Sequence, residues 1–143
     1  MSSLMRGKKR SLRGAVLAKR EALSSLLVRV WGESIQRSAL NLSVYRTARS
    51  VALYSPLGNE VVTSVIQQDA LTARKRLYYP GVTDGTGGMF HIRSEDELVP
   101  GRYGILEPSG SQRFLPGSGE GAVVFVPGIA FDCNGNRLGR GTG

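Results

Sequence analysis

The chain has 143 residues, of which 41% are apolar and 21% are charged. This composition favours a globular protein with a core of ordinary size and excludes wholesale disorder. The formal net charge of +8 favours anionic partners, which include nucleic acid, phosphorylated ligands and polycarboxylates. Charge alone does not choose among these classes.

The cysteine content and the hydropathy of the chain restrict its location. Cys133 is the only cysteine, which excludes an intrachain disulfide and a two-cysteine zinc motif and favours a reducing cytoplasm. No apolar run reaches the roughly 18 residues that a membrane span needs, so we expect no membrane association. The first residues are rich in Arg and Ser and contain no acid before Glu21, a composition that mitochondrial transit peptides share. A cytoplasmic location is expected, with a mitochondrial one as the alternative.

Helical periodicity dominates the first part of the chain. Leu12, Val16, Lys19 and Leu23 recur at helical spacing and predict a first helix. Ser24 or Ser25 is of the type that caps a second helix. The expected inward face of the second helix consists of Val28, Trp31, Ile35, Ala39 and Leu42.

Strands alternate with helical segments in the remaining chain. Residues 50–56 form a short apolar run closed by proline, and residues 60–73 have helical periodicity. Further strands are expected at 75–82, 88–93 and 122–127, the last of them apolar throughout, as is typical of a parallel strand covered on both faces. We therefore predict an α/β fold, an open and mainly parallel sheet flanked by helices, in a single three-layer domain over the whole chain.

A long connection separates the third and fourth expected strands. Ser94 and Glu97 have the spacing of a capping box at a short helical turn. The rest of the connection is expected to be irregular, and long loops of this kind are often functional. The chain shows no internal repeat and no linker between domains.

The chain ends in the sequence GNRLGRGTG, which follows the last expected strand. Ligands of open α/β sheets bind beyond the carboxyl ends of the strands. Gly139, Gly141 and Gly143 would let backbone N–H groups approach an anion, and Arg137 and Arg140 add positive charge. The loop is therefore a candidate phosphate site. The alternative is a flexible turn with solvated arginines, and neither familiar nucleotide-binding motif is matched.

A second basic cluster lies in the first expected helix. Lys9 and Arg13 are four residues apart, and like charges at this spacing repel each other by a few tenths of a kcal/mol. A bound polyanion would remove this repulsion and use both groups. A solvated basic face is the alternative, and the presence of a second cluster at the other end of the chain favours the polyanion.

Other residues are candidates for contacts with a flat ligand. Glu60 follows the first expected strand, and its carboxylate could accept hydrogen bonds from the ring N–H groups of a heterocycle. The alternative is an acidic residue in a first helical turn, where the helix dipole favours it. Met89, Phe90 and Tyr103 could form an apolar wall, although such residues more often belong to a core.

Four stretches of sequence together resemble one known family. They read KKRSLRGAVLAKREALS, ALYSPLGNEVVT, MFHIRSEDELVPGRYGILEPS and VVFVPGIAFDCNGNRLGRGTG. In this order they resemble the 5-formyltetrahydrofolate cyclo-ligases, also called methenyltetrahydrofolate synthetases. The resemblance spans nearly the whole chain; its first two stretches are moderately specific, and the fourth is close to a family signature.

The resemblance implies ATP-dependent closure of 5-formyltetrahydrofolate to 5,10-methenyltetrahydrofolate, with Mg²⁺ required and ADP and phosphate released. It implies that the formyl oxygen attacks the γ-phosphate and that N10 then displaces the phosphate, with Arg140 as the candidate catalytic residue. The implied substrate-binding residues are Glu60, Met89, Tyr103 and Arg140. The implied ATP-binding residues are Lys9, Arg10, Arg13, Arg137, Leu138, Gly139, Arg140, Gly141, Thr142 and Gly143.

In the family the glycine loop continues into Tyr-Tyr-Asp-Arg, whose aspartate helps to bind Mg²⁺, and further strands and helices follow. The resemblance therefore implies a domain that is incomplete at its C-terminus and leaves the magnesium ligand unassigned. The expected partners are ATP and 5-formyltetrahydrofolate, with or without a polyglutamate tail, bound by a monomer that does not bind nucleic acid. One alternative is a non-catalytic remnant that binds nucleotide or folate. The other is a basic nucleic-acid-binding module, but the tyrosines form no recognisable RNA-binding pattern.

Overall fold

The computed structural model describes residues 3–83, 85–101, 104–110, 112–113 and 121–140, and the side chains from residue 7 onwards. The helices are α1 (Ser3–Glu21), α2 (Ser25–Leu40), α3 (Ser43–Thr47), α4 (Ser64–Thr72) and the 3₁₀ turn η1 (Glu95–Glu97). The strands are β1 (Ser50–Ala52), β2 (Arg76–Thr83), β3 (Thr86–Ile92), β4 (Leu98–Pro100), β5 (Leu106–Pro108), β6 (Ala122–Val124), β7 (Ala130–Phe131) and β8 (Arg137–Leu138). None of the helices in these ranges is long and apolar enough to cross a membrane.

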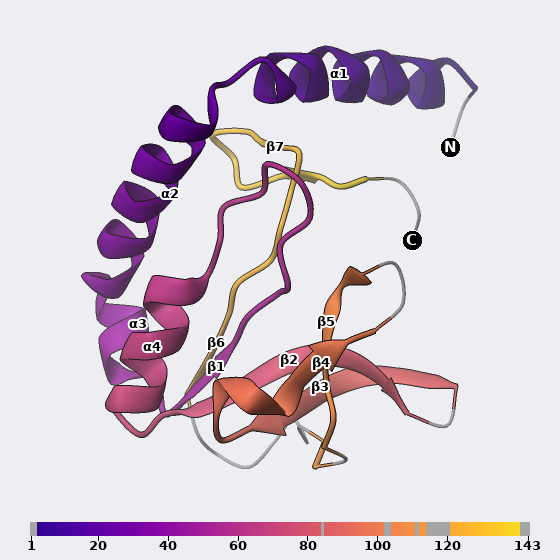
Figure 1. Ribbon diagram of the computed structural model, residues 1–143. Coiled ribbons are helices and arrows are strands. Elements are labelled where there is room, and N and C mark those ends of the chain that lie inside the picture. Colours follow the sequence, from indigo (N-terminus) through magenta and orange to yellow (C-terminus); the bar gives the residue numbers. More distant parts are fainter. Residues whose placement is uncertain (1–2, 84, 102–103, 111, 114–120, 141–143) are drawn as a thin grey trace.

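A mixed, mostly parallel sheet organises the fold (Figure 1). Its order is β3-β2-β1-β6, with β1 parallel to both neighbours and β3 antiparallel to β2. In the register Val51 lies opposite Leu77 on one side and opposite Val123 on the other. Helices α2, α3 and α4 lie together beside the sheet (Figure 1). The predicted α/β class, an open and mainly parallel sheet with flanking helices, is confirmed.

The core forms where β1 and β2 meet these helices. Burial of apolar surface contributes roughly 25 cal/mol per Å² to folding, so the fully buried side chains contribute most of this term. Val51 and Leu77 have no exposed surface, which agrees with the central positions of their strands. The buried cluster consists of Tyr45, Val51, Leu53, Ile66, Ala70, Leu77, Tyr79 and Ile92.

Helix α4 begins at Ser64 and not at Glu60, where the periodicity placed its start. The side chain of Thr63, the residue before the helix, bonds the carbonyl oxygen of Tyr54 and does not cap α4. Gln36 of α2 replaces that cap, because its Oε1 accepts the N–H groups of Val65 at 2.9 Å and of Ile66 at 3.3 Å. A buried glutamine thus satisfies backbone donors that would otherwise have no partner.

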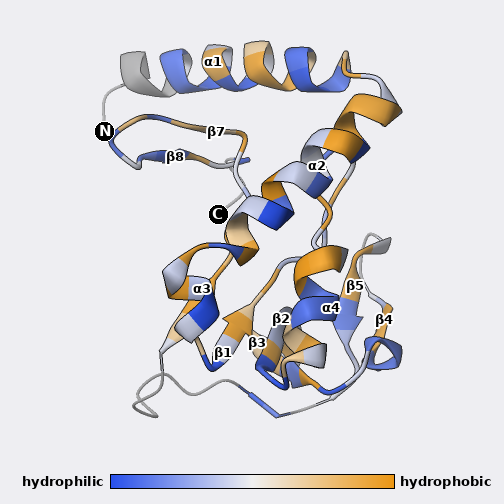
Figure 2. Ribbon diagram, turned by 90° about the vertical axis from the view of Figure 1, so that its left-hand side faces the viewer, coloured by the Kyte–Doolittle hydropathy of each residue, from blue (hydrophilic) through white to orange (hydrophobic). Residues whose placement is uncertain are grey.

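The inward face of α2 differs from the predicted one. The buried residues of the helix are Gly32 and Gln36, whereas Trp31 and Ile35 are 52% and 54% exposed. Leu42, expected on the inward face of the same helix, lies beyond its end and is also exposed. In Figure 2 the ribbon of α2 carries both hydrophobic and hydrophilic bands on the side that faces the viewer. The rotation follows from the capping of α4, since the helix turns the amide of Gln36 towards that neighbour.

The last strand of the sheet, β6, is also less covered than predicted. Within the described residues it pairs with β1 and forms an edge of the sheet, and Val124 is 55% exposed. The strand with both faces buried is β1, in which Ser50, Val51 and Ala52 are all buried.

The connection after β3 contains more structure than predicted. Strands β4 and β5 form an antiparallel ribbon that packs against β2 and β3, where only irregular chain was expected. Each strand has three residues, too few for a visible alternation of polar and apolar residues. The predicted capping box does not form. Ser94 makes no side-chain capping bond, and the side chain of Glu97 accepts the N–H of Arg93.

Replacement of Gln36 by leucine tests the capping of α4. The change keeps a similar volume but leaves the N–H groups of Val65 and Ile66 without acceptors, so we expect the free energy of unfolding to fall by about 1–3 kcal/mol. Chemical denaturation of Gln36→Leu would measure the loss. The control is Gln68→Leu, on the exposed side of α4. Equal stabilities for both variants would contradict the capping role.

Candidate functional site

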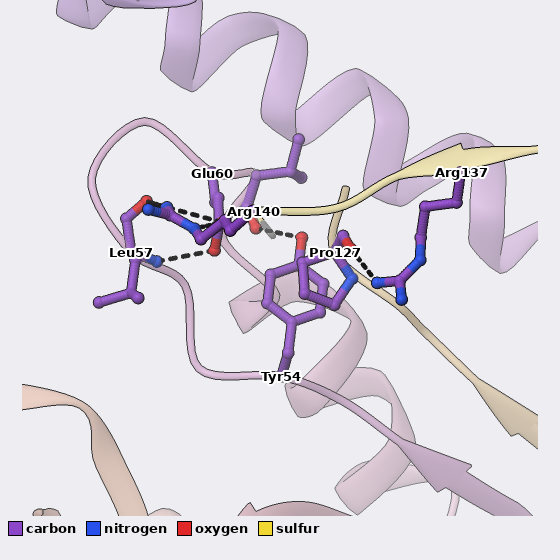
Figure 3. A network of polar contacts seen from close by, with 7 residues as sticks. Tyr54, Leu57, Glu60, Pro127, Arg137 and Arg140 are labelled. Atoms are coloured by element: carbon purple, nitrogen blue, oxygen red, sulfur yellow. Dashed lines mark hydrogen bonds and ion pairs between the residues drawn. The ribbon is translucent and has the colours of Figure 1, made fainter. Parts of the chain in front are cut away.

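The candidate site lies beyond the carboxyl end of β1, where the chain segment after this strand meets the β7–β8 hairpin (Figures 1 and 3). This is the edge at which open α/β sheets bind ligands. The residues come from three separate parts of the sequence: helix α1, the segment from Tyr54 to Thr63, and the C-terminal hairpin.

An ion pair between Glu60 and Arg140 joins two of these parts. Nε and Nη2 of Arg140 donate to Oε1 of Glu60 at 3.2 and 2.9 Å, and Nη2 also donates to the carbonyl oxygen of Leu57 at 3.5 Å. The other carboxylate oxygen of Glu60 accepts the N–H of Leu57 at 3.0 Å (Figure 3). Glu60 is 8% exposed, whereas the side chain of Arg140 is 45% exposed. A buried carboxylate therefore holds an arginine that keeps a face towards solvent.

Helix α1 reaches the same place through Arg13. Its Nε donates to the carbonyl oxygen of Gly139 at 2.6 Å, across 126 positions of sequence. Lys9, one turn earlier, lines a cavity of about 470 Å³ together with Phe131, Arg137 and Leu138. The two basic clusters of the sequence thus lie side by side, with a cavity between α1 and the β7–β8 hairpin.

The β7–β8 hairpin is closed by the side chain of Asp132. Its Oδ1 accepts the N–H groups of Asn134 at 2.9 Å and of Asn136 at 2.8 Å, and its Oδ2 accepts the side-chain amide of Asn136 at 2.8 Å. These bonds, those of the Asn136 side chain foremost, lower the pKa of the Asp132 carboxyl. Gly135, with φ of 79°, occupies the left-handed position of the turn.

Close packing at the start of the hairpin directs Arg137. A Cβ atom at Gly128 would lie 2.6 Å from Cζ of Phe131, so a larger residue there would displace this ring. The guanidinium of Arg137 donates from Nη1 to the carbonyl oxygen of Pro127 at 2.8 Å, and Ile129 N–H bonds the carbonyl oxygen of Leu138 at 2.8 Å. Arg137 lines the first cavity, and its guanidinium points back along its own hairpin to the carbonyl of Pro127 (Figure 3).

A second cavity, of about 420 Å³, lies on the other side of Phe131. Its lining is mainly apolar and includes Ile35, Phe125 and Ile129. The polar members are Arg20, Gln36, Tyr54, Asn59, Glu60 and Thr63. The hydroxyl of Tyr54 donates to the carbonyl oxygen of Val61 at 2.8 Å, and burial, followed by the charge of Glu60, raises its pKa. Phe131 lines both cavities. The first, with Lys9 and Arg137 on its lining, is the basic compartment.

Most of the predicted site residues that the structure describes lie together. These are Glu60, Lys9, Arg13, Arg137, Leu138, Gly139 and Arg140. Arg10 is exposed on α1 and lines neither cavity. Met89 lies on β3, and in the described ranges no hydrogen bond or ion pair joins it to Glu60 or Arg140. Four predicted residues lie outside the described residues: Tyr103, Gly141, Thr142 and Gly143.

The structure adds residues that sequence patterns did not identify. Phe131 divides the cavities, and its position inside the fourth family-like stretch was the available signal. Asn59 donates from Nδ2 to the carbonyl oxygen of Arg20 at 3.0 Å and thereby attaches the loop after β1 to the end of α1. Asn59 lies next to Glu60 in the sequence, but nothing in the pattern indicated a partner 39 positions away.

The described residues do not provide a carboxylate site for Mg²⁺. No group of three His, Cys, Asp or Glu side chains that could hold a metal occurs within the described ranges. Both oxygens of Glu60 are engaged by Arg140 and Leu57, and both oxygens of Asp132 close the hairpin. Mg²⁺ prefers carboxylate and phosphate oxygens, so we assign none of these side chains to the metal.

Comparison with known proteins gives the family. The sequence model of the 5-formyltetrahydrofolate cyclo-ligase family matches residues 5–143. The chain belongs to this family. It is 31% identical over 140 residues to the 5-formyltetrahydrofolate cyclo-ligase of Haemophilus influenzae, covering 95% of this chain and 74% of that protein. It is 32% identical over 151 residues to the mitochondrial 5-formyltetrahydrofolate cyclo-ligase of Arabidopsis thaliana, covering 94% and 54%.

Solved structures agree with this assignment. The NMR structure of 5,10-methenyltetrahydrofolate synthetase from Aquifex aeolicus has a TM-score of 0.82 and 33% identity, covering 94% of this chain and 68% of that one. The synthetase from Mycoplasma pneumoniae has a TM-score of 0.69 at 23% identity, covering 93% and 71%, and shows the shared fold. The cyclo-ligase relatives are enzymes, and the resemblance inferred from four stretches of sequence is confirmed.

Replacement of Asp132 by alanine tests how the cyclo-ligase hairpin is held. The variant loses three hydrogen bonds, so we expect the amide protons of Asn134 and Asn136 to exchange at least about tenfold faster, with the exchange of β1 unchanged. Asp96→Ala, an exposed residue of η1, is the control. Unchanged exchange at Asn136 would contradict the closing role.

The lowered pKa of the Asp132 carboxyl predicts that acid weakens the β7–β8 hairpin. Asp132 stabilises the hairpin fully above the unfolded pKa of about 3.9, and this contribution is lost as the pH falls through the lower pKa of the folded state. The protection factor of the Asn136 amide, corrected for intrinsic exchange, should fall over this pH range in the wild type. In Asp132→Ala it should not change with pH over the same range.

Proposed function

We propose that this cyclo-ligase family member closes 5-formyltetrahydrofolate to 5,10-methenyltetrahydrofolate at the expense of ATP, with release of ADP and phosphate. The observation that carries the proposal is the pair of Glu60 and Arg140, which joins the loop after β1 to the arginine- and glycine-containing segment after β8. The carboxylate of Glu60 can accept hydrogen bonds from the N–H groups of a heterocycle, and the guanidinium of Arg140 can bind a phosphate. A reaction that transfers phosphate to a group on a heterocycle requires both within reach of each other.

The basic compartment is the proposed site of the nucleotide. Lys9, Arg13 and Arg137 supply positive charge around the cavity between α1 and the hairpin. Phe131 and Leu12 offer apolar surface on the same lining, which suits a base or ribose. Phosphoryl transfer depends mainly on positioning and charge neutralisation, and these residues can provide both without a covalent intermediate on the protein.

In the proposed reaction the formyl oxygen attacks the γ-phosphorus and the bond to ADP breaks. N10 then adds to the activated formyl carbon, and phosphate and the N10 proton leave, which yields the methenyl bridge. Arg140 is the proposed catalytic residue, since its guanidinium would neutralise charge on the transferred phosphoryl group. Glu60 would hold the pterin ring by its N–H groups so that the formyl oxygen faces this phosphate.

The ion pair also provides a way to couple the two substrates. Glu60 has its oxygens occupied by Arg140 and by the N–H of Leu57. Ring N–H groups that bond to Glu60 would compete with Arg140 and release its guanidinium towards the phosphates. Because a buried carboxylate needs a partner at every stage, the exchange keeps the charge of Glu60 compensated throughout.

Further features of the assignment belong to the same proposal. Mg²⁺ would accompany ATP as its phosphate complex and supply charge neutralisation, and no step above is assigned to it. The net charge of +8 suits both ATP and a polyglutamate tail. We also propose that the chain is a monomer of one domain. A cytoplasmic location is proposed from the single cysteine, and the sequence shows no RNA-binding pattern that would favour nucleic acid as a partner.

Formation of the methenyl chromophore tests the reaction. Chain 1–143 is mixed with 5-formyltetrahydrofolate and MgATP, with ATP omitted as the control, and ATP-dependent absorbance of the product is the expected result. A second arm fuses the part of the Haemophilus influenzae relative that follows the glycine loop to Gly143, because the chain covers 74% of that relative. Binding of both substrates without turnover in either arm would favour a non-catalytic remnant, and absence of binding would refute the proposal.

Replacement of Arg140 by lysine tests the role of the guanidinium in whichever arm turns over. Lysine keeps the charge but loses the planar group that bonds Glu60 through two nitrogens, so we expect kcat to fall by roughly 10²-fold. The control is Arg29→Lys, which alters an exposed pair with Glu33 on α2. An unchanged kcat in Arg140→Lys would show that only the charge matters.

A further inference from the structure

The lining of the first cavity changes in character along the β7–β8 hairpin. Asp132 follows β7 and Asn136 precedes β8, so both lie at the turn, and both line the cavity. Arg140 lies beyond the end of β8, where it bonds Glu60. The hairpin runs alongside α1 in both views (Figures 1 and 2). The turn thus supplies an amide and a carboxylate, and the open end of the hairpin leads to the arginine that we assign to the phosphate.

The hydrogen bonds of Asp132 fix the orientation of the Asn136 amide. Oδ2 of Asp132 lies 2.8 Å from the side-chain nitrogen of Asn136, and Oδ1 accepts the backbone N–H of the same residue at 2.8 Å. An ionised carboxylate can only accept hydrogen bonds, so the nitrogen of the amide must be the atom that points towards it. The oxygen Oδ1 of Asn136 remains as an acceptor, and none of the described residues donates to it. Asp132 therefore acts as a positioning residue for an acceptor on the lining.

Apolar side chains line the cavity next to these polar groups. Phe131 directly precedes Asp132 and is 62% exposed, and Leu12 of α1 is 53% exposed. Both side chains line the cavity and offer apolar surface to a flat ring. Exposed apolar side chains on a concave surface, with a few polar groups that fix orientation, are typical of ligand sites. This end of the cavity therefore suits a nucleotide base.

We propose that Asn136 determines which nucleotide binds by accepting a hydrogen bond from the 6-amino group of adenine. The base would lie against Phe131 and Leu12 with its amino group towards Asn136. The four residues from Asn136 to Arg140 span at most roughly 14 Å, which is comparable with the length of a nucleoside triphosphate, so the γ-phosphate would extend towards Arg140. The inference rests on the proposed function, because it assumes that the first cavity binds the nucleotide.

A base with an oxygen atom at position 6 does not suit the same acceptors. In inosine and guanine this oxygen would face Oδ1 of Asn136 and the carboxylate of Asp132, and two acceptors form no hydrogen bond. A polar group that loses its partner costs more than an ordinary hydrogen bond gains, so one acceptor can discriminate between amino and oxo bases. Cytosine also carries an amino group, but its single ring would bury less of Phe131 and Leu12.

Binding of ATP and inosine triphosphate to the chain, in the absence of folate, tests the inference. The two nucleotides carry the same phosphates and differ only in the base, where an oxygen replaces the amino group. Their dissociation constants are measured by titration calorimetry with Mg²⁺ at about 0.15 M ionic strength. In the wild type ATP should bind at least about tenfold more tightly than inosine triphosphate.

The possible outcomes separate this inference from the proposed function. Equal affinities for the two nucleotides would overturn the role of Asn136 and leave the nucleotide site in place. Tighter binding of CTP than of ATP would overturn the choice of adenine. Absence of binding of every nucleotide would refute the nucleotide site of the proposed function and this inference with it.

Replacement of Asn136 by alanine separates recognition from the structure of the hairpin. The backbone N–H of residue 136 can still bond Asp132, but the acceptor on the lining is lost. The affinity for ATP should fall roughly fivefold or more and that for inosine triphosphate should not fall, so the preference for ATP should drop to about twofold or less. Equal losses of affinity for both nucleotides would indicate a structural role alone and would overturn the proposal.

The matched control is Asn134→Ala. Asn134 is exposed in the same turn, bonds Asp132 through its backbone N–H and is not on the described lining of the cavity. Its replacement should leave the preference for ATP over inosine triphosphate at the wild-type value. A preference that drops as far in Asn134→Ala as in Asn136→Ala would contradict the assignment to Asn136.

Discussion

The buried carboxylate of Glu60 is the constraint on which the candidate site depends. A carboxylate that is 8% exposed must be compensated, and Arg140 and the N–H of Leu57 provide the compensation. This requirement bends the chain after β1 into a loop, so that α4 starts four residues later than its periodicity suggests. It also draws the segment after β8 back over the sheet edge, where Arg13 bonds Gly139 and attaches α1. One ion pair thus assembles three distant parts of the chain around two adjacent cavities.

The sequence predicted those parts whose signal is local. Strands β2 and β3 are long enough to show their pattern, and the change from helical to strand periodicity predicted the α/β class. The grouping of Lys9 and Arg13 with Arg137 and Arg140 was predictable from two basic clusters and the family resemblance, and the bond from Arg13 to Gly139 agrees with it. Site residues that cluster in short stretches of sequence can be predicted without knowledge of the fold.

Features that depend on tertiary partners were not predictable from local pattern. Gln36 interrupts the apolar face of α2 because it caps another helix, and that cap rotates α2 so that Trp31 is exposed. Strand β6 was expected to be covered on both faces, yet within the described residues it lies at an edge of the sheet. Met89 was assigned to the substrate by resemblance, and its position on β3 leaves that role a proposal. In each case the deciding interaction joins residues far apart in sequence.

A double-mutant cycle on Glu60 and Arg140 tests the central claim most directly. The affinity for 5-formyltetrahydrofolate is measured with and without a non-hydrolysable ATP analogue for the wild type, Glu60→Gln, Arg140→Gln and the double variant. If the pair couples the two sites, the double variant should lose little more affinity than the single variant with the larger loss. The coupling energy should then be about 1 kcal/mol or more. Losses that add within about 0.5 kcal/mol would show that the two residues act independently and would contradict the account.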